Sequence, residues 1–212
     1  MDVIHLQDRM NWGLTRAARI LGHVTDAYRP QGVSDPLNKS NRYLRLHAAF
    51  SRPDGDFRQA VGQGTSAWRG YFDGAYTRVG DYLTQGHDIW FIMAQQSLLP
   101  ISCVKINRVI SITRSTTPTM GIAYGSSPSN AMDNVISGWP VSVMGISNGE
   151  KPAAGLPGDT TIPGWTVLLP AVHEQVIRLA DTVTDEHGTV GVVIAAEQSD
   201  FGWRLSIRQA TV

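Results

Sequence analysis

The sequence predicts a mainly β protein, in which two tandem small β-barrel or β-sandwich domains follow an N-terminal α-helix. The 212 residues include 21 Gly and 11 Pro, dispersed without a period, a composition typical of short strands joined by tight turns. Stretches rich in β-branched and aromatic residues alternate with turn signals such as Asp54-Gly55, Asp73-Gly74 and Gln85-Gly86. The two strand-rich halves also resemble each other, which predicts a duplicated domain.

A helix is predicted from Asp2 to Gly22, with Gly22 as its C-cap. An apolar stripe at helical spacing supports it: Met10, Leu14, Ala17 and Leu21. The arginines of this segment lie off the stripe. An isolated helix of this length is marginal in water, so we expect it to dock on its own domain or on a neighbouring molecule.

The expected domain organisation has four parts. Residues 1–27 form the helix and a connector, 28–114 the first β-barrel domain, 115–138 a linker or long loop, and 139–212 the second β-barrel domain. The linker is predicted because Ser, Thr, Pro, Gly and Asn dominate residues 115–137, a stretch longer than most internal loops. A further Gly- and Pro-rich loop is expected from Asn148 to Gly164.

The repeat is the most specific feature of the sequence. Residues 79–84 align with 179–184, residues 90–96 with 192–198, and residues 103–108 loosely with 204–208. We therefore expect residues 79–108 and 179–208 to have the same strand order. Asp81 and Asp181 occupy equivalent turns, where an Asp side chain accepts hydrogen bonds from backbone N–H groups. With Asp73-Gly74, they are predicted to determine the fold and not to act as acid catalysts.

Motifs that carry chemistry were sought in the sequence. It contains no phosphate-binding Gly-x-x-x-x-Gly-Lys-Ser/Thr loop, no Gly-x-Ser-x-Gly elbow and no His-Glu-x-x-His helix. The carboxylate pairs Asp54/Asp56 and Asp185/Glu186 stand beside glycine, as solvated turn residues do. The single thiol, Cys103, lies in an apolar run and is expected to be buried and inert. The histidines occur singly: His5, His23, His47, His87, His173 and His187. We predict no enzyme activity, no cofactor, and no catalytic, cofactor-binding or metal-binding residues.

Two sets of side chains suggest binding, each with a simpler alternative. Five tryptophans fall in or beside predicted strands, where core packing is favoured over carbohydrate or nucleic-acid stacking: Trp68, Trp90, Trp139, Trp165 and Trp203. Four arginines cluster around predicted turns: Arg52, Arg58, Arg69 and Arg78. In a ring through which DNA passes, these arginines would line the channel, with weak and non-specific DNA contact expected.

Charge is unevenly distributed although the net charge is zero. Residues 1–114 hold 14 Lys and Arg against 9 Asp and Glu, and residues 115–212 hold 4 against 9, which gives +5 and −5. Opposite net charges on the two halves favour head-to-tail association into a homo-oligomeric ring. The alternative is that the surface charges are distributed at random. The sequence shows neither an apolar run long enough for a membrane helix nor a signal peptide, so we expect no membrane contact.

Residues 68–83, 89–96, Leu99-Pro100, 156–159 and 202–209 resemble a family of tailed-bacteriophage and prophage virion structural proteins. The second half is also similar, more faintly, to the small β-barrels of phage head-closure and stopper proteins. The resemblance implies a structural subunit located in the virion and assembled in the bacterial host cytoplasm. It implies a role in the head-to-tail region or in the tail, and we expect a ring in the neck that joins capsid portal to tail and lets DNA pass, with portal, adaptor or tail proteins as partners.

Other functions stay open at this point. A tail-tube or baseplate-hub subunit would also use two related barrels in one chain. A carbohydrate- or receptor-binding module would display several tryptophans on one exposed face, and a small cell-wall hydrolase would need a pocket with convergent titratable groups. The sequence does not give the ring order, the host, the neighbouring proteins or whether DNA is contacted.

Overall fold

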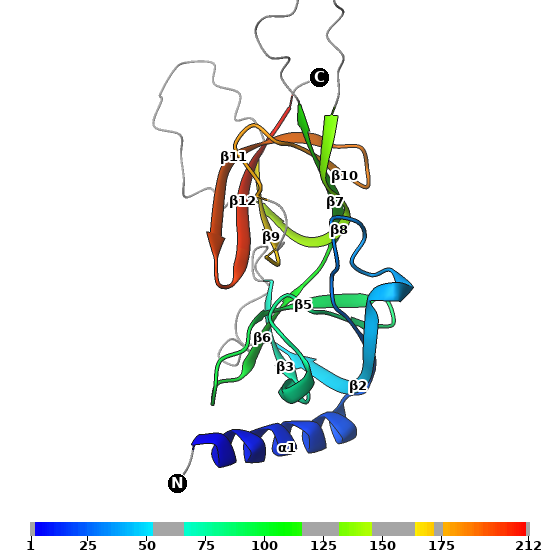
Figure 1. Ribbon diagram of the computed structural model, residues 1–212, viewed down its shortest axis with the longest axis vertical. Coiled ribbons are helices and arrows are strands. Elements are labelled where there is room, and N and C mark those ends of the chain that lie inside the picture. Colours follow the sequence, from blue (N-terminus) through cyan, green and yellow to red (C-terminus); the bar gives the residue numbers. More distant parts are fainter. Residues whose placement is uncertain (1–2, 53–65, 116–131, 146–163, 172–175, 211–212) are drawn as a thin grey trace, which may run out of the picture.

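The computed structural model describes residues 3–52, 66–115, 132–145, 164–171 and 176–210. These residues form one α-helix, two short 3-10 turns and the strands β1 to β12. The strands build two closed antiparallel barrels, one above the other, with α1 lying beneath the first barrel (Figure 1). The predicted class, mainly β with two barrel domains and an N-terminal helix, is confirmed.

Helix α1 (Val3–Leu21) packs on strands β2 and β3 of the first barrel, with Ala18 fully buried at the contact. Its C-terminus is fixed by Gly22, whose N–H donates to the Ala18 carbonyl at 2.8 Å. A Cβ at Gly22 would collide with the backbone carbonyl of Ala48, so glycine is required by close approach. Three predicted stripe residues, Met10, Leu14 and Ala17, are half-buried.

The fourth stripe residue, Leu21, is 74% exposed, so that part of the prediction is wrong. Leu21 lies in the last turn, where the chain leaves the helix for β1, and the barrel does not cover it. Ala18 takes the buried position instead, because its small side chain lets the helix approach β2 closely.

The first barrel contains β1 (His23–Tyr28), β2 (Arg42–Ser51), β3 (Ala67–Tyr71), β4 (Tyr82–Gln85), β5 (Asp88–Ala94) and β6 (Ile101–Lys105). Its strand order is β1-β2-β3-β6-β5-β4, and β4 pairs back onto β1. Inside lies a cluster of apolar residues: Ala27, Ala48, Phe72, Leu83, Trp90, Ile92, Ile101 and Cys103. Closure leaves no free sheet edge, which removes a site for unwanted strand pairing.

The second barrel contains β7 (Arg108–Ser115), β8 (Met132–Gly145), β9 (Gly164–Leu169), β10 (Thr182–Asp185), β11 (Val190–Ser199) and β12 (Gly202–Gln209). Its order is β10-β11-β12-β9-β8-β7, and β10 closes on β7. Counted from its own first strand, each barrel therefore has the order 1-2-3-6-5-4. The predicted common strand order of the two halves is confirmed.

Strand pairing corrects the alignment of the repeat. Tyr82 pairs with Phe91, and its counterpart Thr182 pairs with Val192, so Phe91 and Val192 are equivalent. The residue equivalent to Trp90 is then Gly191 and not Val192. Sequence similarity alone misplaced this strand by one residue, because the hairpin loop before it differs in length between the barrels.

The last aligned segment is displaced further. Ile92 pairs with Cys103, and Val193 pairs with Ile207, so Cys103 is equivalent to Ile207 and not to Arg204. The register irregularity falls after Ile92 in one barrel and after Val193 in the other. A bulge shared at equivalent positions supports duplication, because bulges are conserved features of related sheets.

The expected domain boundaries also differ from the structure. Strand β1 belongs to the first barrel, although residues 23–27 were expected to form a connector. Residues 108–114, expected in the first domain, form β7 of the second barrel. The passage between barrels is therefore the short stretch between β6 and β7.

The predicted linker also differs from the structure. Residues 132–138, expected in the linker, belong to β8. Residues 116–131 lie outside the described residues and connect β7 to its pairing partner β8.

One apolar cluster runs across both barrels. Tyr82, Phe91 and Val104 of the first barrel belong to the same buried cluster as Trp139 and the core of the second. The rings of Tyr82 and Trp139 meet edge-on with centroids 6.3 Å apart, and the Tyr82 hydroxyl donates to the Pro140 carbonyl at 2.9 Å. The Val33 carbonyl, between β1 and β2, accepts from Trp139 Nε1 at 3.0 Å. The described parts of the barrels are thus packed as a single body.

Candidate functional site

Equivalent arginine–aspartate pairs occupy the seam where each barrel closes. In the first barrel, Arg29 donates from Nε to Asp81 Oδ1 at 2.9 Å and from Nη2 to Oδ2 at 2.8 Å. In the second, Arg114 binds Asp181 in the same way at 2.8 and 2.9 Å. Both carboxylates are buried, with exposed fractions of 2% and 1%. Arg29 Nη2 also reaches the Tyr76 carbonyl, as Arg114 Nη2 reaches the equivalent carbonyl of Val176.

The bend before β4 and β10 places these aspartates. Asp81 Oδ2 accepts the backbone N–H of Arg78 at 2.8 Å, and Asp181 Oδ2 accepts that of Arg178 at 2.8 Å. The predicted acceptance of bend N–H groups is therefore confirmed. Asp73 likewise accepts the N–H of Ala75 at 3.0 Å, at the start of a 3-10 turn.

Sequence reasoning missed the arginine partners. Each lies in or just after the first strand of its barrel, far in sequence from its aspartate, and no local pattern marks such a pair. The hydrogen bonds that Arg29 donates to Asp81 raise the pKa of Arg29, and those that Arg114 donates to Asp181 raise the pKa of Arg114. The first barrel adds Tyr43, whose hydroxyl donates to Asp81 Oδ2 at 2.6 Å.

Asp185 and Cys103 are titratable residues outside the closing seam. Asp185 accepts the N–H groups of His187 and Thr189 in a hairpin turn; burial acts to raise its pKa, and these hydrogen bonds outweigh it and lower the pKa. Burial raises the pKa of the Cys103 thiol, which has no exposed surface. Among the described residues, no three His, Cys, Asp or Glu side chains group as metal ligands. Asp54, Asp56 and His173 lie outside the described residues.

The strand tryptophans contribute to the cores, as expected. Trp90, Trp139 and Trp203 are 3%, 1% and 4% exposed, and Trp68 and Trp165 are half-buried against the cores. Of the four arginines, Arg52 lies over the Trp68 ring at 5.3 Å, and Arg69 is on the adjacent β3. Arg78 lies in the bend before β4, and Arg58 is outside the described residues. That these arginines line a DNA channel stays a prediction.

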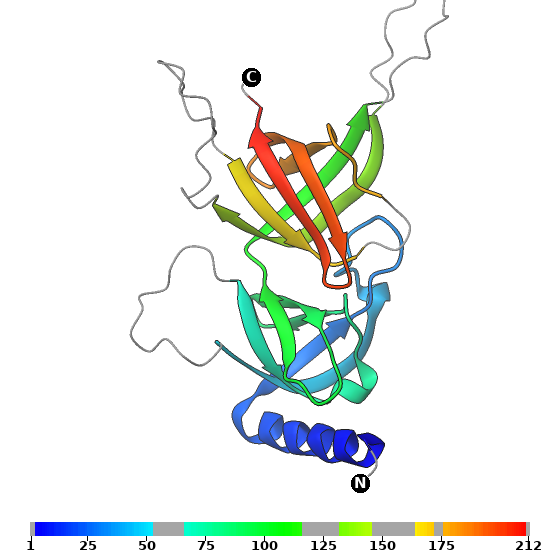
Figure 2. The same cartoon turned by 90° about the vertical axis from the view of Figure 1, so that its left-hand side faces the viewer.

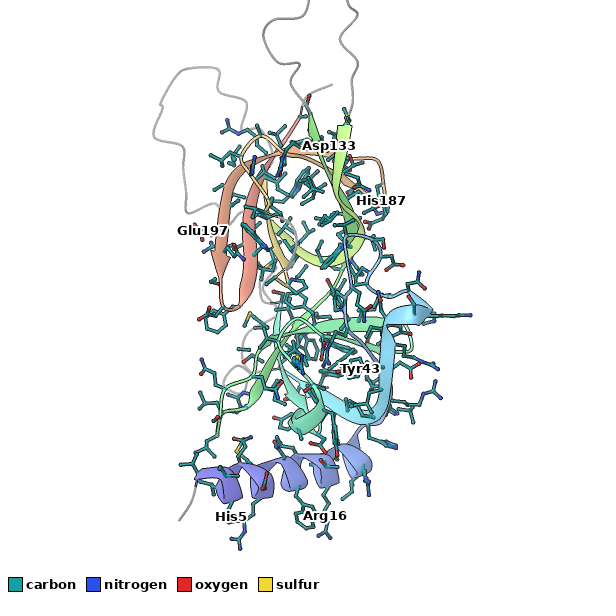
Figure 3. The ribbon with its side chains drawn as sticks, viewed as in Figure 1. His5, Arg16, Tyr43, Asp133, His187 and Glu197 are labelled. Carbon is teal, nitrogen blue, oxygen red and sulfur yellow. The ribbon has the colours of Figure 1, made fainter. Side chains whose placement is uncertain are left out.

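The outer side of α1 is the candidate functional surface. Trp12 and Ile20 point away from the barrel, with exposed fractions of 66% and 74%. Arg16 lies over the Trp12 ring at 5.6 Å, and Arg16 and His5 both project away from the barrel (Figure 3). Contiguous exposed apolar side chains mark interaction sites on folded proteins. Tryptophan and arginine in particular are enriched at protein–protein interfaces.

A loop extends this surface at the N-terminal end of α1. The N–H of Leu98, between β5 and β6, donates to Gln7 Oε1 at 2.7 Å and so holds the loop against the helix. Leu98 has φ of 62°, a left-handed conformation uncommon for leucine. Leu98 and Leu99 are 37% and 51% exposed, beside the exposed first turns of α1. We call α1 and this loop the helix surface; its exposed apolar residues are Val3, Ile4, Leu6, Trp12, Ile20, Leu21, Leu98 and Leu99.

The charge separation is smaller than the sequence division suggested. With the barrels meeting near Asn107, residues 1–107 hold 12 Lys and Arg and 9 Asp and Glu, whereas residues 108–212 hold 6 and 9. The net charges are therefore +3 and −3. The difference arises because Arg108 and Arg114 belong to the second barrel, where they pair with Glu186 and Asp181.

Comparison with known proteins assigns no family. No family model, no curated protein and no solved structure matches the chain. Among the described residues, no helix combines the length and the apolar character needed to span a membrane.

Proposed function

We propose that this protein is a structural subunit of a tailed-phage virion, which forms a ring in the head-to-tail neck. The helix surface is the observation that carries the proposal. It presents Trp12 and Ile20 to solvent at one end of the molecule, on a helix already docked through its other face. Burying such a surface on a neighbouring ring would remove apolar area from water at little ordering cost, because the helix is already in place.

Charge and shape support association with further copies. Helix α1 carries Arg9, Arg16 and Arg19 against Asp8, and the second barrel exposes Glu197 and Asp200 near the tip of the β11–β12 hairpin. Glu197 projects outward from this hairpin (Figure 3). Opposite charges on these two surfaces attract neighbouring copies, although exposed charge pairs add only ~0–1 kcal/mol each. Apolar burial by the helix surface would then hold the contact.

A tail-hub or tail-tube subunit is the second candidate, and the duplicated barrel favours it. Two barrels of the same strand order in one chain let three chains present six similar barrels, which can dock on a sixfold tube. The two barrels lie one above the other along the molecule (Figure 2). The neck ring is our first choice because the helix surface lies at one end of this long axis, where it can meet a neighbouring ring.

Localisation on purified virions tests the proposal. Antibodies against the folded protein, with gold labels viewed by electron microscopy, should mark the junction between head and tail. Labels at the far end of the tail would instead assign the protein to the tail hub. Particles that contain none of this protein by mass spectrometry would overturn both.

A further inference from the structure

Differences between the equivalent barrels point to a binding site at one end of the second barrel. In the first barrel this end is filled by Phe50 and Trp90, whose rings stack with centroids 3.9 Å apart and planes 7° from parallel. Trp68 meets Trp90 edge-on at 6.4 Å. The three rings fill the end of the barrel, which is the usual arrangement in small barrels.

The second barrel lacks two of these rings. Trp68 pairs with Cys103, and Trp165 pairs with the equivalent Ile207, so a tryptophan is kept at this position. In the first barrel, Phe50 pairs with Gly70, which lies two residues after Trp68. In the second barrel, Val143 pairs with Val167, which lies two residues after Trp165. Phe50 is thus replaced by Val143. Gly191 replaces Trp90, as shown above, so the stacked pair has no counterpart.

A cavity of about 300 Å³ lies beside Val143, the counterpart of Phe50. Its walls include Val143, Val167, Trp165 and Ile207. Gly191 lies behind two of these walls: a Cβ there would collide with Ile207 and come within 3.0 Å of Trp165, so these two side chains take the space beside Gly191. The volume is at the lower end of those that hold small ligands, and an apolar cavity of about half this size holds benzene in another protein.

The polar groups at the mouth of the cavity already have partners. The Asn107 amide exchanges hydrogen bonds of 2.8 Å with both the N–H and the carbonyl of Val143. Asp185 accepts two backbone N–H groups, and Arg108 pairs with Glu186 at 3.2 Å. Since these groups are engaged, the remaining contacts for a ligand come from the apolar side chains Val143 and Ile207 and from the aromatic wall of Trp165. Such a site selects a neutral, flat, apolar group over a charged one.

We propose that this end of the second barrel binds one aromatic ring of phenyl or indole size, in the place that Phe50 fills in the first. The adjoining β8–β9 connection does not supply the ring, because residues 146–163 contain no Phe, Tyr, Trp or His. The occupant is a free aromatic compound or an aromatic side chain of a second copy. The inference rests on comparison of the barrels and does not depend on the proposed virion role.

Titration of the full chain with indole, followed by methyl NMR, tests the site. Methyl signals of Val143, Val167 and Ile207 should shift and saturate, with half-saturation at ~0.1–1 mM, as expected for a small ring in a partly open cavity. Signals of Leu83 and Ile92, in the filled first barrel, should stay in place. Unsaturable shifts, or equal shifts in both barrels, would overturn the proposal.

A variant that fills the cavity provides a second test of the site. Val143→Phe restores the residue type found at position 50, and it should weaken indole binding at least ~10-fold while the melting curve stays cooperative. The matched control is Ile194→Phe, which adds a ring at a half-exposed site on β11 and should bind indole normally. Undiminished binding by folded Val143→Phe overturns the proposal; if that variant does not fold, the wild-type shift map decides.

The source of the ring is decided by two further measurements. Native mass spectrometry of protein purified from cells would show a retained small mass if a free compound is the occupant. Sedimentation would show dissociation of self-associated protein by indole if a side chain of another copy is the occupant.

Discussion

Arg114 binds Asp181 through two parallel hydrogen bonds at the point where β7 and β10 close the second barrel, as Arg29 binds Asp81 where β1 closes on β4. Each arginine is the next residue after the last ladder pair, Thr113 with Thr182 or Tyr28 with Tyr82. The ion pair therefore extends the closing ladder by one position through side chains. It joins the first strand of each barrel to the bend that precedes the fourth.

Asp181→Ala should lower the stability of the protein substantially. Breaking a buried ion pair costs ~3–5 kcal/mol, and we expect about 2–4 kcal/mol because the Arg114 side chain is 27% exposed and can be partly hydrated. For a chain of this size the melting temperature should fall by roughly 5–15 °C. Asp81→Ala should have a similar effect, larger than the few degrees that a single bend hydrogen bond would give.

Arg45→Ala is the matched control for the buried pair. Arg45 makes a similar bidentate contact with Asp26, but its side chain is 62% exposed, so its loss should lower the melting temperature far less than either aspartate variant. Calorimetry of the three variants compares the sites directly. Equal losses at the buried and exposed pairs would argue against a structural role for the seam, as would an unchanged melting curve of Asp81→Ala.

Stability should decline in alkali because of buried groups that resist ionisation. Burial raises the pKa of Tyr82, and burial with the hydrogen bond to Asp81 raises that of Tyr43. The folded pKa values lie above the unfolded value of about 10, so this stability is fully present below pH ~10 and is lost as pH rises above it. Denaturant unfolding from pH 9 to 11 should show this loss.

Tyr82→Phe identifies one of the groups responsible. Above pH ~10 the unfolding free energy should fall less steeply with pH, because up to one proton fewer is released on unfolding. At neutral pH the variant should lose ~1 kcal/mol, because the hydrogen bond to the Pro140 carbonyl is removed. An unchanged slope would contradict burial of this hydroxyl in the folded protein.

The shared core predicts that both barrels unfold together. Trp139→Ala removes a side chain that is 1% exposed and packs on Tyr82, at a cost of ~3–5 kcal/mol. Wild-type protein should show a single calorimetric transition, and the variant a single transition at lower temperature. Two separate transitions in the wild type would show that the barrels are energetically independent.

The helix surface should act in assembly and not in stability. Trp12→Ala should change the unfolding free energy by less than ~0.5 kcal/mol, because the ring is 66% exposed. Binding to a partner ring should weaken. Ala18→Asp is the contrasting variant: it places a charge in the buried contact with the barrel and should undock α1, which far-UV circular dichroism and proteolysis would detect.

Sedimentation tests the assembly of the isolated protein. We expect a monomer or weak association in dilute solution, because charges of +3 and −3 on the two parts attract weakly and are screened beyond ~8 Å at physiological salt. Removal of residues 1–22 should abolish ring formation on a partner. A stable ring at high salt that survives this removal would assign assembly to the barrels.

Local sequence was sufficient for the N-terminal helix, for the hairpin turns and for the duplication. Apolar spacing predicted the N-terminal helix, turn residues marked the hairpins, and the matching bends at Asp81 and Asp181 revealed two copies of one domain. These features depend on backbone propensity and contacts within a few residues. The sequence also predicted burial of the strand tryptophans, because large apolar side chains on strands have few alternatives to a core.

Tertiary structure decided what depends on contacts between distant residues. An apolar strand at residues 108–115 fits either barrel by pattern, and only its pairing with β8 and β10 assigns it to the second. The arginine partners, at sequence separations of 52 and 67 residues, leave no local signal. Likewise, the cavity beside Val143 could be interpreted only after strand register had shown which residue replaces Phe50. A shift of one residue in a strand moves every side chain to the opposite face, so register, which similarity cannot fix, determines what fills a barrel.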